Sequence, residues 1–231
     1  MELVATLIPD LPHGKLISML NDQMEVNEVN RIMGITNNDH AFRSAAGSLL
    51  LAHMVCRISG YPVSSISIHR YPNGKPFLPD FPNLHFNISH TDHLAVLAID
   101  TQLVGIDIEK VSTARMAVAE RFFGPDEKVM LKNCPKVQRD SLFFELWTAR
   151  ESFVKAIGIG IFNSMGEYSA KKTALGWEVN HAETGLWNIR HYKLLSDYTV
   201  GLCSKTQVFP EAIEEIAFIL VHRSDPPSRK I

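Results

Sequence analysis

The sequence lacks three features that would each indicate a particular class of protein. It has no excess of basic residues, since 23 Lys and Arg against 25 Asp and Glu leave a net charge of −2, which argues against a general nucleic-acid binder. No segment approaches the roughly 18 apolar residues of a membrane helix, and no targeting signal opens the chain. Cysteine is scarce and scattered, at Cys56, Cys134 and Cys203, which fits reduced thiols better than disulfides or a zinc site. We therefore expect a soluble, cytoplasmic protein with no membrane or nucleic-acid partner.

Hydrophobic periodicity predicts a mixture of helices and strands. A long helix is predicted from the caps Asn37 and Asn38 to Gly60, and another over residues 140–157. Shorter helices are predicted within 11–34, 114–123 and 126–132, and strands over 3–8, 66–71, 84–89, 94–99, 103–108, 177–179, 187–192, 198–203 and 216–221. The order of strand, helices, long helix and strands occurs twice, with the change near Gln102. We therefore expect an α+β fold of two similar subdomains, 1–102 and 103–231, with a ligand cleft between them.

The run from Val104 to Lys110 sets two acids among apolar residues. Strand periodicity places Asp107 and Glu109 on one face, roughly 6.5 Å apart along the backbone. Two such carboxylates suit Mg²⁺, which commonly takes one or two carboxylates together with substrate phosphate. The alternative interpretation is an ordinary strand face turned to solvent.

A second run places another acid and a lysine on one helix face. Glu151 and Lys155 are four residues apart, and Trp147 lies one turn earlier on the same face. Gly158 and Gly160 would end this helix and let the backbone pass close to a ligand. The alternative is a surface ion pair of a few tenths of a kcal/mol beside a core tryptophan.

Two weaker signals lie earlier in the chain. Ser89 and His90 end a predicted strand beside a turn, where both could donate hydrogen bonds to a phosphate. Ser89 could equally cap the turn, with His90 merely exposed. Residues Tyr71 to Pro76 are a turn signal that carries Lys75, and alone they indicate only a loop.

Four segments in this order carry a specific resemblance: Gly74-Lys75-Pro76, Phe86-Asn87-Ile88-Ser89-His90, Gly105-Ile106-Asp107-Ile108-Glu109, and Trp147-x-x-x-Glu151-Ser152-Phe153-x-Lys155. From about Asp39 to Gly160, and more weakly beyond, the chain resembles the surfactin-type, monomeric 4'-phosphopantetheinyl transferases. This family moves the phosphopantetheine arm of coenzyme A onto a carrier-protein serine and releases adenosine 3',5'-bisphosphate. The resemblance implies two related α+β halves in pseudo-twofold arrangement, with coenzyme A in the cleft between them.

The resemblance also implies roles for the charged residues. Asp107, Glu109 and Glu151 would hold Mg²⁺, for which Mn²⁺ could substitute, on the pyrophosphate of coenzyme A. Lys155 and His90 would add positive charge or hydrogen-bond donors to the same phosphates. Glu151 would also take the proton of the incoming serine, directly or through a metal-bound water.

Further residues are placed against coenzyme A by the same resemblance. The turn Asn73 to Pro76 and Ser89 would lie along the adenosine, and the 3'-phosphate would meet arginines, whose planar donors suit phosphate. Surfactin-type members often carry a basic residue where this chain has Glu28, and Arg150 stands where the family usually has lysine. The expected coenzyme A contacts are Arg31, Arg43, Ser44, Asn73, Gly74, Lys75, Pro76, Ser89, His90 and Lys155.

An apo acyl or peptidyl carrier protein is the expected partner of a monomeric enzyme. Because the carrier should present an acidic helix near its serine, the candidate docking surface is Val111 to Gly124, which includes Arg115. The competing interpretation is a core helix, and Phe122 and Phe123 cannot both point outward. Carriers of fatty acid, polyketide, nonribosomal peptide and siderophore synthesis are all compatible with the sequence.

Two other functions remain as alternatives. A Mg²⁺-dependent hydrolase of nucleotide pyrophosphates would share the three acids but need no docking surface. A non-catalytic module that binds carrier protein or coenzyme A is the other alternative, and the intact Asp107, Glu109, Glu151 and Lys155 argue against it.

Overall fold

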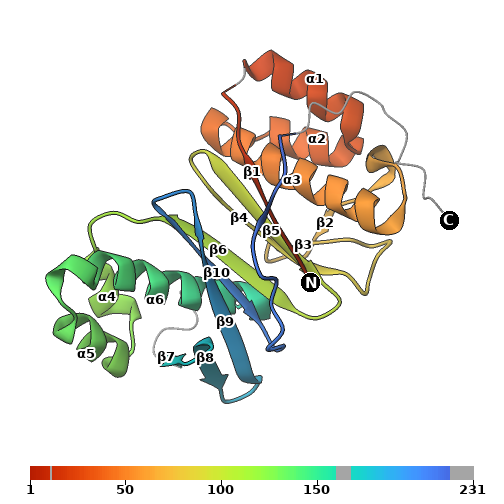
Figure 1. Cartoon of the computed structure of the whole chain (residues 1–231). Helices are drawn as coiled ribbons and strands as arrows, with labels where there is room; N and C mark the ends of the chain where they lie inside the picture. The colour runs from red at the N-terminus through yellow and green to blue at the C-terminus, as the bar shows by residue number, and fades with distance from the viewer. Residues whose placement is uncertain (11, 160–167, 219–231) are drawn as a thin grey trace. The chain divides into compact units, whose positions relative to one another are not determined.

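Figure 1 shows the computed structural model, which describes residues 1–10, 12–159 and 168–218. The chain divides into two compact units. Of the described residues, the first contains 1–3, 85–89, 98–159 and 168–213, and the second contains 4–10, 12–84, 90–97 and 214–218. The strands β1 (Glu2–Leu7), β4 (His85–Thr91) and β5 (Leu94–Asp100) therefore contribute residues to both units. The boundary predicted after residue 102 stays a prediction.

The second unit contains the N-terminal helices, most of a four-stranded sheet and a small two-stranded sheet. A four-stranded sheet has the order β11-β1-β5-β4, in which β1 and β11 pair in parallel, and β2 and β3 form a small antiparallel pair. The elements are β1 (Glu2–Leu7), α1 (His13–Gln23), α2 (Val26–Met33), α3 (Asn38–Ser59), η1 (Val63–Ser65), β2 (His69–Arg70), β3 (Pro76–Phe77), β4 (His85–Thr91), β5 (Leu94–Asp100) and β11 (Glu214–Glu215).

The ends of α3 follow from two local signals. The side chain of Asn37 accepts a hydrogen bond from the backbone N–H of His40 at 2.8 Å, which satisfies a donor that the first turn leaves open. At the other end Gly60 adopts a φ of 77°, a left-handed conformation that glycine reaches without a steric penalty. The predicted helix from Asn37 to Gly60 is confirmed at both ends.

The first unit is built around one long helix and an antiparallel sheet. The sheet has the order β6-β10-β9-β8-β7, and α6 packs against β6 and β10. The elements are β6 (Val104–Lys110), α4 (Met116–Phe122), α5 (Pro125–Asn133), α6 (Lys136–Ile157), β7 (Ala170–Thr173), β8 (Gly176–His181), β9 (Gly185–Leu194) and β10 (Tyr198–Ser204).

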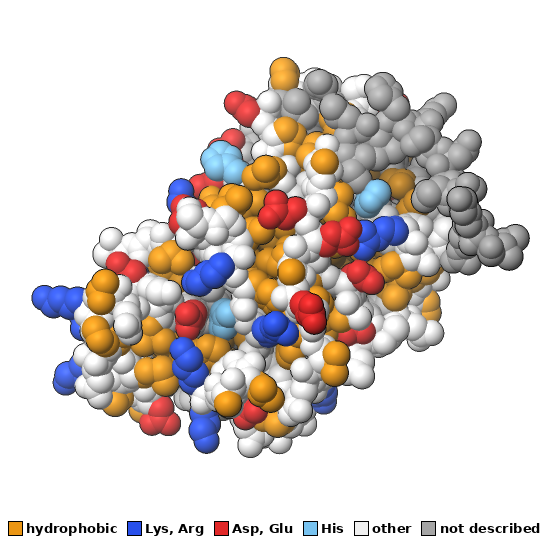
Figure 2. Space-filling model, viewed as in Figure 1, with side chains coloured by type: hydrophobic (Ala, Val, Ile, Leu, Met, Phe, Trp, Pro, Cys, Tyr) orange, Lys and Arg blue, Asp and Glu red, His pale blue; other side chains and the backbone are white. Residues whose placement is uncertain are grey.

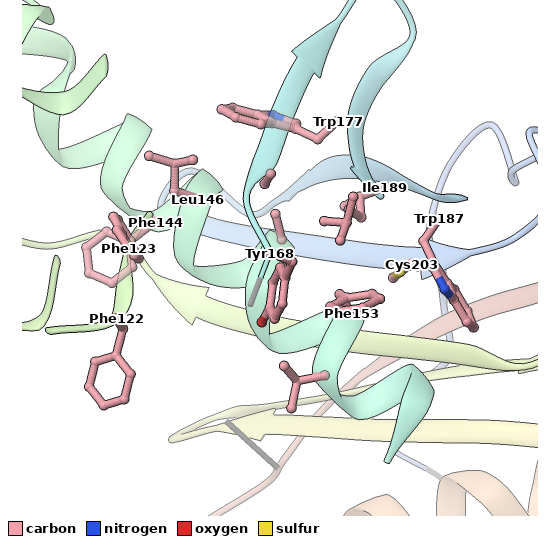
Figure 3. Close-up of a cluster of buried hydrophobic side chains, with 14 of the residues drawn as sticks. Phe122, Phe123, Phe144, Leu146, Phe153, Tyr168, Trp177, Trp187, Ile189 and Cys203 are labelled. Atoms are coloured by element: carbon pink, nitrogen blue, oxygen red, sulfur yellow. The ribbon is translucent and has the colours of Figure 1, made fainter. Parts of the chain in front are cut away.

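Aromatic side chains fill the space between α6 and this sheet. Phe153 of α6 lies 4.5 Å from Tyr168 and 5.9 Å from Trp187 between ring centroids, in edge-to-face contacts that Figure 3 shows. Phe143 and Phe144 extend the same cluster toward α4 and α5. Burial of each large apolar side chain stabilises the fold by about 1.5–3 kcal/mol, so the cluster fixes α6 on the sheet.

The structure confirms the α+β class and differs from the predicted elements in detail. The helix α6 begins at Lys136, directly after Pro135, rather than at residue 140. The strand predicted over 66–71 is reduced to β2, while β3, β7 and β11 were not predicted. The strand predicted over 216–221 falls partly outside the described residues, and 216–218 form no strand. Gly160 also lies outside the described residues.

Among the described residues, each helix is too short or too polar to cross a membrane.

Candidate active site

The carboxylates of β6 lie on the face that meets α6. Gly105, Asp107 and Glu109 alternate along the strand and so share one face. Asp107 is only 4 % exposed and Glu109 is half-buried, which contradicts a solvent-facing strand. Across from them, Trp147 of α6 donates its indole N–H to Glu109 Oε1 at 3.2 Å. Spacing on α6 puts Glu151 and Lys155 on the same side as Trp147.

Gly105 allows the helix to approach the strand. A Cβ at this position would lie 2.0 Å from the carbonyl oxygen of Ser152 and 2.5 Å from the amide nitrogen of Ala156. Both atoms belong to the α6 backbone, which cannot move aside by a change of rotamer. Because glycine has no side chain, Gly105 lets β6 lie close to α6 and so sets the distance of Asp107 and Glu109 from the helix.

Gly105→Ala is expected to lower the free energy of unfolding by at least about 2 kcal/mol, because the added methyl group overlaps helix backbone. The measurement is urea denaturation of both proteins. Gly14→Ala is the matched control, since a Cβ there meets nothing within 4 Å, and it should leave stability unchanged or slightly higher. Equal midpoints for Gly105→Ala and the wild type would contradict this packing role.

Asp107, Ser89 and Lys155 form a triangle of hydrogen bonds. Lys155 Nζ donates to Asp107 Oδ1 at 2.6 Å and to Ser89 Oγ at 3.1 Å, and Ser89 Oγ donates to Asp107 Oδ1 at 3.0 Å. Next to it, Asn87 Oδ1 accepts the backbone N–H of Ile106 at 2.8 Å and so ties β4 to β6. The triangle engages only Oδ1 of Asp107. The other carboxylate oxygen, Oδ2, is buried and has no hydrogen-bond partner. A buried carboxylate oxygen in this state is an open ligand position.

The acids of this site disfavour one another's charge. Burial first, and then the charges of Asp107 and Glu109, raise the pKa of Glu151 to about 7, although Lys155 opposes the rise. Burial and the charge of Asp107 likewise raise the pKa of Glu109, against the opposing effect of Arg115, which lies 3.9 Å away. The site thus has more negative charge than its cations balance, and positive charge placed here would be stabilised.

The side chains of this site offer the type of ligand atom that a divalent cation binds. Carboxylate oxygens are what Mg²⁺ prefers, and Asp107 Oδ2 is an oxygen without a partner. Within the described residues, no three His, Cys, Asp or Glu side chains are grouped closely enough to hold one ion. Asp107, Glu109 and Glu151 therefore influence one another electrostatically without converging on one point in this structure.

Arg150, next to Glu151, is engaged inside the protein. It is 1 % exposed, and its guanidinium donates to Glu127 Oε2 at 2.8 Å and to the carbonyl of Tyr168 at 3.1 Å. Glu127 also accepts the backbone N–H groups of Gly124 and Ala170. This buried pair links α5, α6 and the start of β7. Nothing in the sequence pattern indicated it, since Glu127 lies in a short helix with ordinary charges.

The remaining predicted residues belong to the second unit. His90 of β4 and His40 of α3 have ring centroids 6.2 Å apart, and Arg43 of α3 pairs with Asp92 at 3.6 Å. Ser44 follows Arg43 on α3 and is half-buried. Arg31 is bound to Glu28, a contact that the sequence did not predict.

The predicted turn from Asn73 to Pro76 joins β2 to β3. Asn73 Oδ1 accepts the N–H of Lys75 at 3.1 Å, and Gly74 has a φ of 84°. Burial lowers the pKa of Lys75. The turn signal in the sequence was therefore correct, and glycine is required at its left-handed position.

Comparison with known proteins identifies the family. Residues 103–203 match the model of the 4'-phosphopantetheinyl transferase superfamily, and residues 12–102 match that of the 4'-phosphopantetheinyl transferase N-terminal region. The chain therefore belongs to the 4'-phosphopantetheinyl transferases, as the resemblance predicted, and it is an enzyme of that class.

Curated relatives support the same assignment. The chain is 31% identical to the 4'-phosphopantetheinyl transferase psf-1 of Bacillus pumilus, over 75% of this chain and 76% of the relative. It is 34% identical to the transferase gsp of Aneurinibacillus migulanus, over 70% and 67%, and 30% identical to the transferase Sfp of Bacillus subtilis (strain 168), over 79% and 82%. A solved holo-(acyl-carrier-protein) synthase from Bacillus anthracis in complex with CoA aligns with a TM-score of 0.38 and 17% identity, over 43% of this chain and 91% of that chain.

Proposed function

We propose that this protein transfers the phosphopantetheine arm of coenzyme A to a serine of an apo acyl or peptidyl carrier protein. The observation that carries the proposal is the face of β6 with Asp107 and Glu109, set against Lys155 and Glu151 of α6 in a chain of this family. In the reaction the serine oxygen forms a bond to phosphorus, the pyrophosphate P–O bond breaks, and adenosine 3',5'-bisphosphate leaves.

Asp107, Glu109 and Glu151 are the proposed ligands of Mg²⁺, for which Mn²⁺ could substitute. The partnerless Asp107 Oδ2 and the raised pKa values of Glu109 and Glu151 support this set. When bound, the ion would neutralise the charge of the pyrophosphate and polarise the phosphoryl group. Positive charge at this place would also relieve the mutual repulsion of the three acids.

Glu151 is the proposed acceptor of the serine proton, directly or through a water molecule. Its pKa of about 7 lies close to the pH at which a cytoplasmic enzyme works, and this is where a general base is most effective. Lys155 is proposed to bring positive charge to the transferred phosphate, since its Nζ is already held at Asp107. His90 is proposed to donate to the same phosphates.

Coenzyme A is the proposed donor of the phosphopantetheine arm. The turn from Asn73 to Pro76 is proposed to lie along the adenosine, together with Ser89, whose hydroxyl here bonds Asp107 and Lys155. Arg31, Arg43 and Ser44 are the proposed contacts of the 3'-phosphate, because arginine presents a planar fork of donors.

The proposed docking surface for the carrier protein is Val111 to Gly124. Arg115 is 57 % exposed and Met116 is also exposed, and Figure 2 has Lys and Arg side chains at the surface over α4 and α5. Phe122 and Phe123 are both buried in the core cluster, so neither would form the surface. A basic surface with exposed apolar groups is complementary to an acidic helix.

We further propose a cytoplasmic monomer of two subdomains, 1–102 and 103–231. The two family models meet at residues 102 and 103, which supports the boundary. Cys56, Cys134 and Cys203 are all free thiols, as a reducing compartment favours.

Intact-mass spectrometry of an apo carrier protein tests the proposed function. With this protein, coenzyme A and Mg²⁺, the carrier is expected to gain one phosphopantetheine unit, and EDTA should abolish the gain because the three acids would lose their cation. A carrier whose serine is replaced by alanine is the control. Release of adenosine 3',5'-bisphosphate with no carrier modified would identify a hydrolase, and intact coenzyme A with every acyl and peptidyl carrier would indicate a binding module.

A further inference from the structure

The strand β6 has an edge whose backbone donors are met by side chains of β4. It is the last strand in the order β6-β10-β9-β8-β7, and in an antiparallel ladder every second residue turns its N–H away from the partner strand. Ile106 and Ile108 turn their N–H groups away from β10 in this way. Asn87 Oδ1 accepts the N–H of Ile106 at 2.8 Å, and Ser89 Oγ accepts that of Ile108 at 3.4 Å.

These two contacts fix the register between β4 and β6. Both join residues that are 19 positions apart in the chain, so the two strands run side by side in the same direction. Asn87 and Ser89 are two residues apart and therefore face the same side of β4. All four residues belong to one compact unit. A shift of β6 along β4 by one residue would break both contacts at once.

The shorter of the two contacts lies inside the protein. Ile106 and Asn87 are both buried. A buried N–H that has no acceptor is costly, because it loses the hydrogen bond that water gives it in the unfolded chain. Without the Asn87 side chain, the backbone at Ile106 would have to move toward another acceptor or toward water. Asn87 therefore holds this part of β6 in its place.

Asp107 lies between the two backbone groups that β4 holds. Its Oδ1 accepts from Lys155 Nζ at 2.6 Å and from Ser89 Oγ at 3.0 Å, while the buried Oδ2 has no hydrogen-bond partner. The carboxylate is thus fixed through one of its oxygens and through the backbone on both sides of its own Cα. The place of the other oxygen, Oδ2, depends on where β6 lies relative to β4.

We propose that Asn87 is a positioning residue of the transfer reaction, because it sets the place of Asp107 Oδ2 and thereby the affinity of the site for a divalent cation. Asn87 acts at one remove, through the backbone of Ile106. Removing an outer group that orients a metal ligand typically costs about 10–100-fold in metal affinity or activity. This inference rests on the proposed function, which assigns Asp107 to the cation.

The competing role for Asn87 is that of a cover for the edge of β6. Unpaired backbone groups at the edge of a sheet are commonly covered in native proteins. A hydrogen bond with only this role would stabilise the fold, and its loss would leave the affinity for a cation unchanged. A positioning bond affects both quantities, so the two roles differ in a measurable way.

Binding of Mn²⁺ tests the inference without the reaction. The ion is titrated into metal-free protein, and unbound Mn²⁺ is measured by electron paramagnetic resonance. Asn87→Ala is expected to raise the Kd of Mn²⁺ by about tenfold or more. Asn87→Leu, which keeps the branched shape but lacks the acceptor, should do the same if alanine disturbs the fold. Asn87→Asp keeps an oxygen for the N–H of Ile106 and adds negative charge, so its Kd should not exceed the wild-type value.

Asn188→Ala is the matched control. Asn188 of β9 belongs to the same unit, is 9 % exposed like Asn87, and donates to the carbonyl of Lys205 at 3.2 Å. Its replacement should lower the midpoint of urea denaturation, as that of Asn87 does, and leave the Kd of Mn²⁺ unchanged. An equal rise of the Kd in both alanine variants, no rise in Asn87→Ala, or a wild type that binds no Mn²⁺ would overturn the inference.

Carrier modification separates failure of the inference from failure of the proposed function. Asn87→Ala is expected to raise the Mg²⁺ concentration that gives half the maximal rate by about tenfold, and saturating Mg²⁺ should restore most of the rate. Wild-type transfer together with a Kd of Mn²⁺ that does not change in Asn87→Ala would keep the transferase and reject the positioning role. A Kd that depends on Asn87, with no carrier modified, would keep the positioning role and reject the transferase.

Discussion

Replacing Glu151 with glutamine is expected to stop phosphopantetheine transfer and, above pH 7, to stabilise the metal-free protein. Glutamine cannot accept the serine proton, and it supplies no charge to a cation. It also removes a carboxylate whose charge is disfavoured in the fold, because burial and the charges of Asp107 and Glu109 raise its pKa to about 7. Activity and stability should therefore change in opposite directions.

The sign of the stability change follows from proton linkage. Below the pKa of the unfolded chain, about 4.3, Glu151 is protonated in both states and resembles glutamine. Between this value and about 7 the unfolded chain releases the proton while the folded protein keeps it, so wild-type stability falls as the pH rises. Above pH 7 the variant should be more stable by about 1–3 kcal/mol, allowing for partial exposure of the side chain.

Thermal unfolding in EDTA at pH 4.5 and pH 8 measures this effect, and carrier modification with Mg²⁺ measures the activity. Glu183→Gln is the matched control, since Glu183 is exposed in the turn between β8 and β9 and should change neither quantity. An active Glu151→Gln enzyme would reject the proposed role. Identical melting of variant and wild type at pH 8 would reject the raised pKa.

Asp107→Asn is expected to reduce the rate of transfer by about a thousandfold or more. Removing one preorganised electrostatic group at the reacting atoms typically slows the chemical step by this order of magnitude. The amide keeps the shape of the side chain but loses its charge, and with it both the proposed metal ligand Oδ2 and the ion pair to Lys155. Folding should change little, because the Lys155 side chain is partly exposed and can be hydrated.

Single-turnover transfer with saturating coenzyme A and Mg²⁺ measures the effect of Asp107→Asn on the chemical step. Asp22→Asn is the control, because Asp22 is an exposed residue of α1 in the other unit. A wild-type rate for Asp107→Asn would show that Asp107 holds no cation in the reaction.

Local signals in the sequence were sufficient for much of the secondary structure. The helix α3 begins after an asparagine cap and ends at a left-handed glycine, and α6 ends at Gly158 with a φ of 79°. These features depend on backbone conformation within a few residues, which the sequence encodes directly. The start of α6 was missed because Lys136 to Arg139 has little apolar periodicity, and its first turn follows Pro135.

The spacing of acids gave the candidate site, but the tertiary structure decided which partners each side chain has. Alternation along β6 and the four-residue spacing on α6 predicted the shared faces of Asp107 with Glu109 and of Glu151 with Lys155. Only the packing of α6 on β6, which Gly105 permits, brings Lys155 to Asp107 and Trp147 to Glu109.

The sequence by itself determined the family, the main helices and the acids of the candidate site, because these depend on local patterns and on residue types at fixed spacing. The tertiary structure alone decided that Arg150 is buried against Glu127, that Phe122 and Phe123 are both in the core, and that Glu28 joins Arg31 to Arg70. Such pairings join distant parts of the chain, and their energies depend on burial and charge that arise only when the elements pack.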